Sequence, residues 1–250
     1  MVNAEWIERQ HVFAHVIGNQ AYRQYGIAAF AFCGSGMFNG GCAHGIGEQM
    51  IFGLGIGDLE KAKRECREAT ECSISCFHGL GHGFLVLESY NISRALEDCG
   101  GGACIDGIFM EYAWAGPKPN LSQNDPTRFC MSFYGEDARY SCTIYLPVLF
   151  TKVFGWEYER TVAECVRAQD PVIRKGCKNS FGIWAVHISR GNLQKILQYC
   201  GFFELKDDEY SCLTSAIIEV EYSRFYGWEK TVATLCKSLP LRMRLGLCMI

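Results

Sequence analysis

The chain has 250 residues and a formal net charge of −3, and 49% of its residues are hydrophobic while 20% are charged. This composition is too apolar for a disordered chain, and the near-neutral charge lacks the basic footprint of a nucleic-acid-binding protein. No apolar run approaches the roughly 20 residues of a membrane helix, so we expect neither a nucleic acid partner nor a membrane span. Cysteine is the outlier, with 15 residues.

The cysteines form two interleaved series with one period. Within each series, successive members lie 28 to 38 residues apart, and most steps are close to 35. Two series that share a period indicate an internal repeat. The first series is Cys42, Cys76, Cys104, Cys142, Cys177, Cys212 and Cys248, and the second is Cys33, Cys66, Cys99, Cys130, Cys165, Cys200 and Cys236.

Each repeat predicts a pair of helices. From a first-series cysteine to the next second-series cysteine there are 23 to 26 residues, which fits two helices of about ten residues and a tight turn. The turn is marked by a glycine, as at Gly57, Gly155, Gly191 and Gly227, because glycine commonly ends a helix. We therefore expect an all-α fold, a solenoid of about seven disulfide-linked helical hairpins.

The loops between hairpins predict disulfides. From a second-series cysteine to the next first-series cysteine there are 9, 10, 5, 12, 12, 12 and 12 residues. Cys72 is left over, and the rival pairing is Cys66–Cys72 with Cys76 free. Seven bridges indicate an oxidising compartment, so we expect an extracytoplasmic protein, secreted or periplasmic. The expected bridges are Cys33–Cys42, Cys66–Cys76, Cys99–Cys104, Cys130–Cys142, Cys165–Cys177, Cys200–Cys212 and Cys236–Cys248.

In this architecture the chain resembles the Sel1-like and tetratricopeptide repeat proteins, and above all the secreted, cysteine-rich Sel1-like proteins. The resemblance covers nearly the whole chain, but it is one of paired, bridged helices, since the family's Ala/Leu-Gly/Tyr consensus is absent. It implies that a peptide or protein binds in the concave groove of the solenoid. A small molecule is the other partner we expect in such a groove.

We expect a single solenoid domain over residues 1–250. Its fourth repeat is interrupted where Pro117, Pro119 and the pair Asp125-Pro126 predict a loop over residues 115–127. The repeats within residues 1–114 carry the candidate site, and we expect the repeats within residues 128–250 to be structural.

Histidine recurs at two positions of the first helix of a repeat. Counted from the first-series cysteine, position +2 holds His44 and His78, and position +6 holds Glu48 and His82. Positions four residues apart lie on one face of a helix. Equivalent faces of neighbouring helices in a solenoid lie side by side, so these side chains are expected to meet.

Two further repeats extend this pattern. The first repeat lacks the opening cysteine, but a step of 24 residues back from Cys33 places His11 at +2 and His15 at +6. The fourth repeat has Asp106 at +2, and Glu111 follows position +6 directly. Asp106 and Glu111 are therefore reserve candidates for the same face.

Clustered imidazoles and carboxylates favour a transition metal, and we expect one or two ions of copper, iron or zinc. The HxxxE and HxxxH pairs resemble, in ligand type alone, the di-iron sites of hemerythrin-type proteins. Open coordination positions would allow redox chemistry or metal-assisted hydrolysis, so the sequence leaves open whether the protein is an enzyme. The alternative is a metal-free module that binds a peptide or protein. The candidate ligands are His11, His15, His44, Glu48, His78 and His82, with Asp106 and Glu111.

Two residues outside this set have weaker patterns. Cys72 is a further candidate as a metal ligand or nucleophile, because a thiolate next to the histidines can do either. His187 stands alone on its helix and is expected to be structural.

Overall fold

The computed structural model describes residues 4–33, 40–223 and 227–248. This part of the chain is all-α and contains no strand, which confirms the predicted fold class. By its internal contacts the chain divides into two compact units, Met1–Pro117 and Lys118–Ile250. The continuous solenoid and the single domain over residues 1–250 stay predictions.

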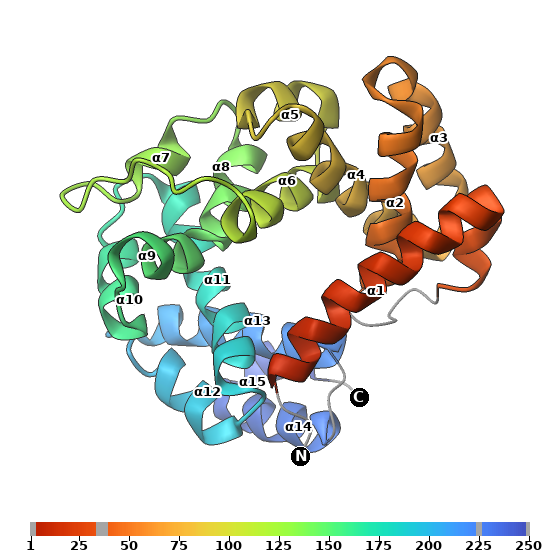
Figure 1. Cartoon of the computed structure of the whole chain (residues 1–250). Coiled ribbons are helices and arrows are strands. Elements are labelled where there is room, and N and C mark those ends of the chain that lie inside the picture. The colour runs from red at the N-terminus through yellow and green to blue at the C-terminus, as the bar shows by residue number, and fades with distance from the viewer. Residues whose placement is uncertain (1–3, 34–39, 224–226, 249–250) are drawn as a thin grey trace. The chain divides into compact units, whose positions relative to one another are not determined.

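The described part of the N-terminal unit contains α-helices and three short 3₁₀ helices (Figure 1). Helices α1, α2, α4 and α6 contact one another in this order, while α3 contacts α2 and α4, and α5 contacts α4 and α6. The elements are α1 (Ala4–Tyr25), η1 (Gly26–Ala31), α2 (Gly41–Leu54), η2 (Ile56–Asp58), α3 (Leu59–Glu68), η3 (Thr70–Cys72), α4 (Ser73–Leu87), α5 (Ile92–Cys99) and α6 (Ala103–Trp114).

The helix ends follow from local sequence. Asn91 caps α5, because its side-chain oxygen accepts a hydrogen bond from the backbone N–H of Arg94 at 3.3 Å. Gly100 ends the same helix with a φ of 77°, a conformation that glycine adopts without strain. Turn chemistry of this kind produces the paired helices that the cysteine spacing predicts.

Glycine lets α2 and α4 touch through their backbones. A Cβ atom added to Gly79 would lie 2.0 Å from the carbonyl oxygen of His44, and one added to Gly47 would lie 2.3 Å from that of Cys76. Real Cβ atoms do not approach other atoms so closely, so neither position tolerates a side chain at this helix separation. The close approach brings the imidazoles of neighbouring helices into contact.

The same reciprocal contact joins the neighbouring helices. Gly45 faces the carbonyl of His15 between α1 and α2, and Gly107 faces the carbonyl of His78 between α4 and α6. His15 in α1, His44 in α2 and His78 in α4 therefore occupy equivalent positions, because the carbonyl of each contacts a glycine of the neighbouring helix. This corrects the predicted register of the first repeat, which paired His11 with His44. The 24-residue step fails there because η1, and not a full second helix, follows α1.

All seven bridges expected from the cysteine spacing are present as disulfides in the structure, with Cα–Cα distances of 5.4 to 6.1 Å. Cys72 is the free cysteine, and it is buried. Its thiol donates a hydrogen bond to the carbonyl oxygen of Cys33 at 3.0 Å, and burial raises its pKa. A thiol in that environment is held in its protonated, less reactive form.

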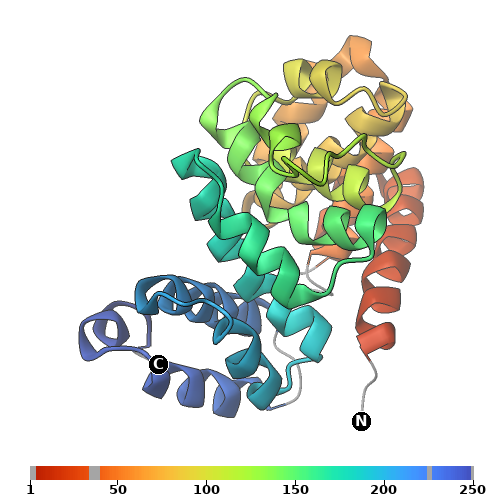
Figure 2. The same cartoon turned by 90° about the vertical axis from the view of Figure 1, so that its left-hand side faces the viewer.

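The described part of the C-terminal unit is also built of α-helices, drawn from green to blue in Figure 2. Helices α8, α11 and α13 contact one another in succession, and Trp184 on α11 donates a hydrogen bond from Nε1 to the carbonyl oxygen of Ile144 at 2.7 Å. Residues 115–127 form no helix and precede α7. The helices are α7 (Arg128–Met131), α8 (Glu136–Ile144), α9 (Leu146–Phe154), α10 (Tyr158–Val166), α11 (Pro171–Ser189), α12 (Leu193–Cys200), α13 (Lys206–Ser223), α14 (Trp228–Ser238) and α15 (Leu241–Leu247).

Among the described helices, none combines the length and the apolar character that crossing a membrane requires.

Candidate metal centre

Three adjacent helices of the N-terminal unit bring five imidazole rings into one cluster: His11 and His15 from α1, His44 from α2, and His78 and His82 from α4. Neighbouring rings have centroids 4.4 to 5.9 Å apart. Two groups of three have donor atoms within 4.8 Å of one another, and His44 belongs to both. The sequence pattern predicted this meeting of side chains, and the glycine contacts account for its tightness.

His44 is the centre of the cluster. It is buried, its ring stacks on that of His78 at 4.4 Å, and its Nδ1 atom has no hydrogen-bond partner among the described residues. Burial, together with the neighbouring imidazoles, lowers the pKa of His44 well below its usual value. The ring is therefore neutral near pH 7 and keeps a lone pair, as a metal ligand must.

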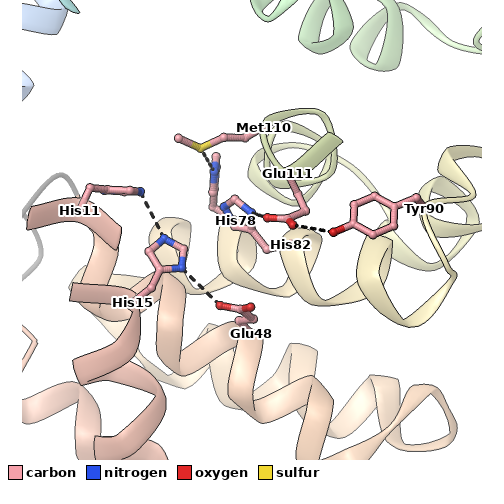
Figure 3. A network of polar contacts seen from close by, with 8 residues as sticks. All are labelled: His11, His15, Glu48, His78, His82, Tyr90, Met110 and Glu111. Carbon is pink, nitrogen blue, oxygen red and sulfur yellow. Dashed lines mark hydrogen bonds and ion pairs between the residues drawn. The ribbon is translucent and has the colours of Figure 1, made fainter. Parts of the chain in front are cut away.

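His82 is oriented by a carboxylate on the next helix. Its Nδ1 atom lies 3.0 Å from Oε2 of Glu111, and the Tyr90 hydroxyl donates to Oε1 of the same carboxylate at 3.2 Å (Figure 3). The buried Nε2 atom of His82 then remains without a partner among the described residues. A proton on Nδ1 directed to a carboxylate leaves the Nε2 lone pair for a metal, and this arrangement is common around metal-binding histidines.

Burial shifts the pKa values of both His82 and Glu111. Burial and the neighbouring His15 lower the pKa of His82 to about 3, so this ring is neutral over the physiological range. Burial also raises the pKa of Glu111, although the Tyr90 hydrogen bond opposes that change. The Tyr90 hydrogen bond therefore stabilises the charged carboxylate that faces His82.

His15 repeats this arrangement on the other side of the cluster. Its Nδ1 atom lies 3.3 Å from Oε2 of Glu48, and its Nε2 atom lies 3.2 Å from Nε2 of His11 (Figure 3). Two nitrogens bound to one ion at 2.0 to 2.1 Å in tetrahedral geometry would lie about 3.3 Å apart. The two Nε2 atoms are therefore spaced as two ligands of one ion would be.

The predicted carboxylates lie outside the donor groups. Glu48 contacts Nδ1 of His15, and Glu111 contacts Nδ1 of His82. Asp106, in the first turn of α6, belongs to neither group of three. The sequence pattern missed two neighbours of the cluster, Tyr90 and Met110. Met110 occupies the predicted +6 position, whereas no repeated signal marks Tyr90.

The two weaker candidates belong to neither donor group. Nε2 of His187, on α11 of the C-terminal unit, lies 3.0 Å from Oε1 of Glu219. Cys72 contacts the backbone of Cys33 and is absent from both donor groups. Neither residue contributes a donor atom to the cluster.

The cluster as a whole offers imidazole nitrogen donors, and burial lowers the pKa values of His44, His78 and His82, so these three rings are neutral near pH 7. The carboxylates of Glu48 and Glu111 contact the cluster through His15 and His82. Each buried nitrogen without a partner destabilises the fold by about 1–3 kcal/mol, and a bound cation would satisfy both. The histidine groups are thus compatible with metal binding. Comparison with known protein families, curated proteins and solved structures finds no match.

Proposed function

We propose that this protein binds one or two transition-metal ions, copper, iron or zinc, through the five clustered histidines. The observation that carries the proposal is the pair of buried donor atoms without a partner, Nδ1 of His44 and Nε2 of His82, among the rings of three adjacent helices. Neutral imidazoles suit these metals, whereas calcium and magnesium prefer oxygen ligands.

In this proposal the carboxylates orient the ligands. Glu48 holds His15 and Glu111 holds His82, each through Nδ1, so that the Nε2 atoms bind the ion. Asp106 stays a reserve ligand that belongs to neither donor group. Because both groups of three include His44, one ion in either group or two ions on both sides of His44 are consistent with the donor positions.

The proposed location is extracytoplasmic, in a secreted or periplasmic protein. Seven disulfides support it, since such bridges persist in oxidising compartments. Within that proposal, an ion with an open position would support redox chemistry or metal-assisted hydrolysis, and a closed coordination shell would make the protein a carrier.

A second candidate function is binding of a peptide or protein without metal. It is favoured by an apolar stripe on α1, where Val12, Phe13, Val16 and Ile17 are all exposed. Exposed apolar patches commonly mark interaction sites. Partner capture that persists after chelation and after substitution of His44 would support this function over metal binding.

Elemental analysis of the purified full-length protein tests the first proposal. After reconstitution with copper, iron or zinc and removal of excess ion, wild type is expected to keep at least one ion per chain. His44→Ala should lose it, because His44 belongs to both donor groups. His187→Ala is the matched control, since this histidine lies on α11 and pairs with Glu219, and it should retain the ion. Wild type without a bound transition metal would refute the proposal.

A further inference from the structure

A methionine sulfur lies against the histidine cluster. Sδ of Met110, on α6, is 3.2 Å from Nε2 of His78, on α4 (Figure 3). Gly107, one turn earlier on α6, faces the carbonyl oxygen of His78 and holds the two helices at backbone contact. The sulfur is therefore positioned by the same close packing that assembles the imidazoles.

The distance of 3.2 Å between Sδ of Met110 and Nε2 of His78 suits two ligands of one ion. A nitrogen bound at about 2.0 Å and a sulfur at about 2.3 Å would lie roughly 3.1 to 3.5 Å apart for bond angles between 90° and 109°. His78 also belongs to the donor group with His44 and His82. A metal bound to that group can thus reach the thioether without a rearrangement of helices.

Met110 is the soft donor beside this group. Cys42, Cys76 and Cys104, which lie on α2, α4 and α6, are held in disulfides. The donor group itself consists of neutral imidazoles, with Glu111 bound to the far side of His82. Addition of Met110 gives a set of three nitrogens and one thioether, in which His44 and His82 are buried and His78 and Met110 are partly exposed.

We propose that Met110 is a ligand and that the ion beside His78 is copper, held as Cu(I) by His44, His78, His82 and Met110. This inference rests on the proposed metal-binding function and adds the identity of the metal. Thioether sulfur selects Cu(I) among the common protein metals. The desolvation penalty of an ion grows with the square of its charge, so four neutral donors in a partly buried site favour a monovalent over a divalent cation, while the Glu111 carboxylate beside His82 opposes this preference.

Hydrogen bonding is the other interpretation of the contact. If Nε2 of His78 carries a proton, it donates a weak hydrogen bond to the sulfur, and Met110 is a packing neighbour. Affinity for Cu(I) would then not depend on the thioether. The two interpretations therefore differ in a measurable quantity.

The test is competition for Cu(I) between the full-length, disulfide-intact protein and a chromophoric chelator, with ascorbate as the reductant. Met110→Leu preserves the side-chain volume and should lower Cu(I) affinity at least tenfold, while Zn(II) affinity changes less than about twofold. Met50→Leu is the matched control, because Met50 is a fully buried methionine of α2, and it should leave both affinities unchanged.

X-ray absorption of the copper-loaded wild type keeps the inference testable if Met110→Leu does not fold. The spectrum should contain a sulfur scatterer in addition to nitrogen. Copper bound by nitrogen and oxygen alone, or equal Cu(I) affinities of wild type and Met110→Leu, would overturn the inference and leave the proposed function standing. A wild-type protein that binds no copper, iron or zinc would overturn both.

Discussion

Substitution of Gly79 by alanine is the sharpest perturbation of the helix contact that assembles the cluster. The added Cβ would lie 2.0 Å from the carbonyl oxygen of His44, and real Cβ atoms keep at least 3.0 Å. Helices α2 and α4 must therefore move apart by about 1 Å. Because His44 and His78 sit on these two helices, the donor group widens by a comparable amount, which is half of a metal–nitrogen bond length of about 2.0 Å.

The expected effects of Gly79→Ala are lower stability and loss of metal. Overpacking of a well-packed interior destabilises the fold by about 1–3 kcal/mol. Because the added Cβ meets the backbone of His44, which cannot move aside as a side chain can, we expect a loss near the upper end of this range. A loss of about 3 kcal/mol corresponds to a fall in Tm of roughly 6–12 °C. Thermal unfolding of metal-free protein measures the first effect, and metal content after reconstitution measures the second.

Gly53→Ala is the matched control for this experiment. Gly53 lies in the last turn of α2, and a Cβ there meets nothing within 4 Å. Alanine should be neutral or stabilise the helix by up to about 1 kcal/mol, because glycine is a poor helix former. If Gly79→Ala keeps wild-type stability and metal content, the glycine contact does not determine the site.

Other predictions test the surroundings of the cluster. Glu111→Gln removes the charge that orients His82, so metal affinity should fall about 10- to 100-fold in chelator competition; unchanged affinity would contradict the orienting role. In metal-free protein the unfolded chain protonates His82 below pH 6.5, whereas the folded chain keeps it neutral to about pH 3. His82 should therefore contribute a fall in the unfolding free energy of about 1.4 kcal/mol per pH unit below 6.5, in addition to contributions of the same sign from His44 and His78, whose pKa values burial also lowers. Urea unfolding of His82→Gln should show a pH dependence that is shallower by that amount. Metal at a hundred times its Kd should raise that free energy by about 2.7 kcal/mol, as thermal unfolding will check. Cys72→Ser should abolish the single thiol titrated under denaturing conditions and leave seven disulfides; a remaining thiol would favour the Cys66–Cys72 pairing.

The disulfides and the all-α fold could be predicted because the relevant signal is periodic along the chain. Cysteine spacing reports directly on where one helical pair ends and the next begins. The register of α1 could not be predicted in this way, since α1 contains no cysteine. A better signal was present, because His15, His44 and His78 are each followed three residues later by glycine.

The roles of individual polar groups could not be read from spacing. Glu48 and Glu111 fit the ligand pattern in sequence, yet their oxygens face the outer nitrogens of His15 and His82. Which nitrogen a carboxylate contacts depends on rotamers and on helix separation, and neither has a periodic signature. The contact of Met110 with His78 has the same origin, because it depends on how closely α6 approaches α4.

The most direct test of the central claim is anomalous diffraction from crystals of protein loaded with copper, iron or zinc, recorded above and below the absorption edge of the metal. We predict an anomalous difference peak within bonding distance of His44, bounded by His82 on α4 or by His15 on α1. A map without a peak at His44, or with peaks only at other sites such as His187, would contradict metal binding by the cluster.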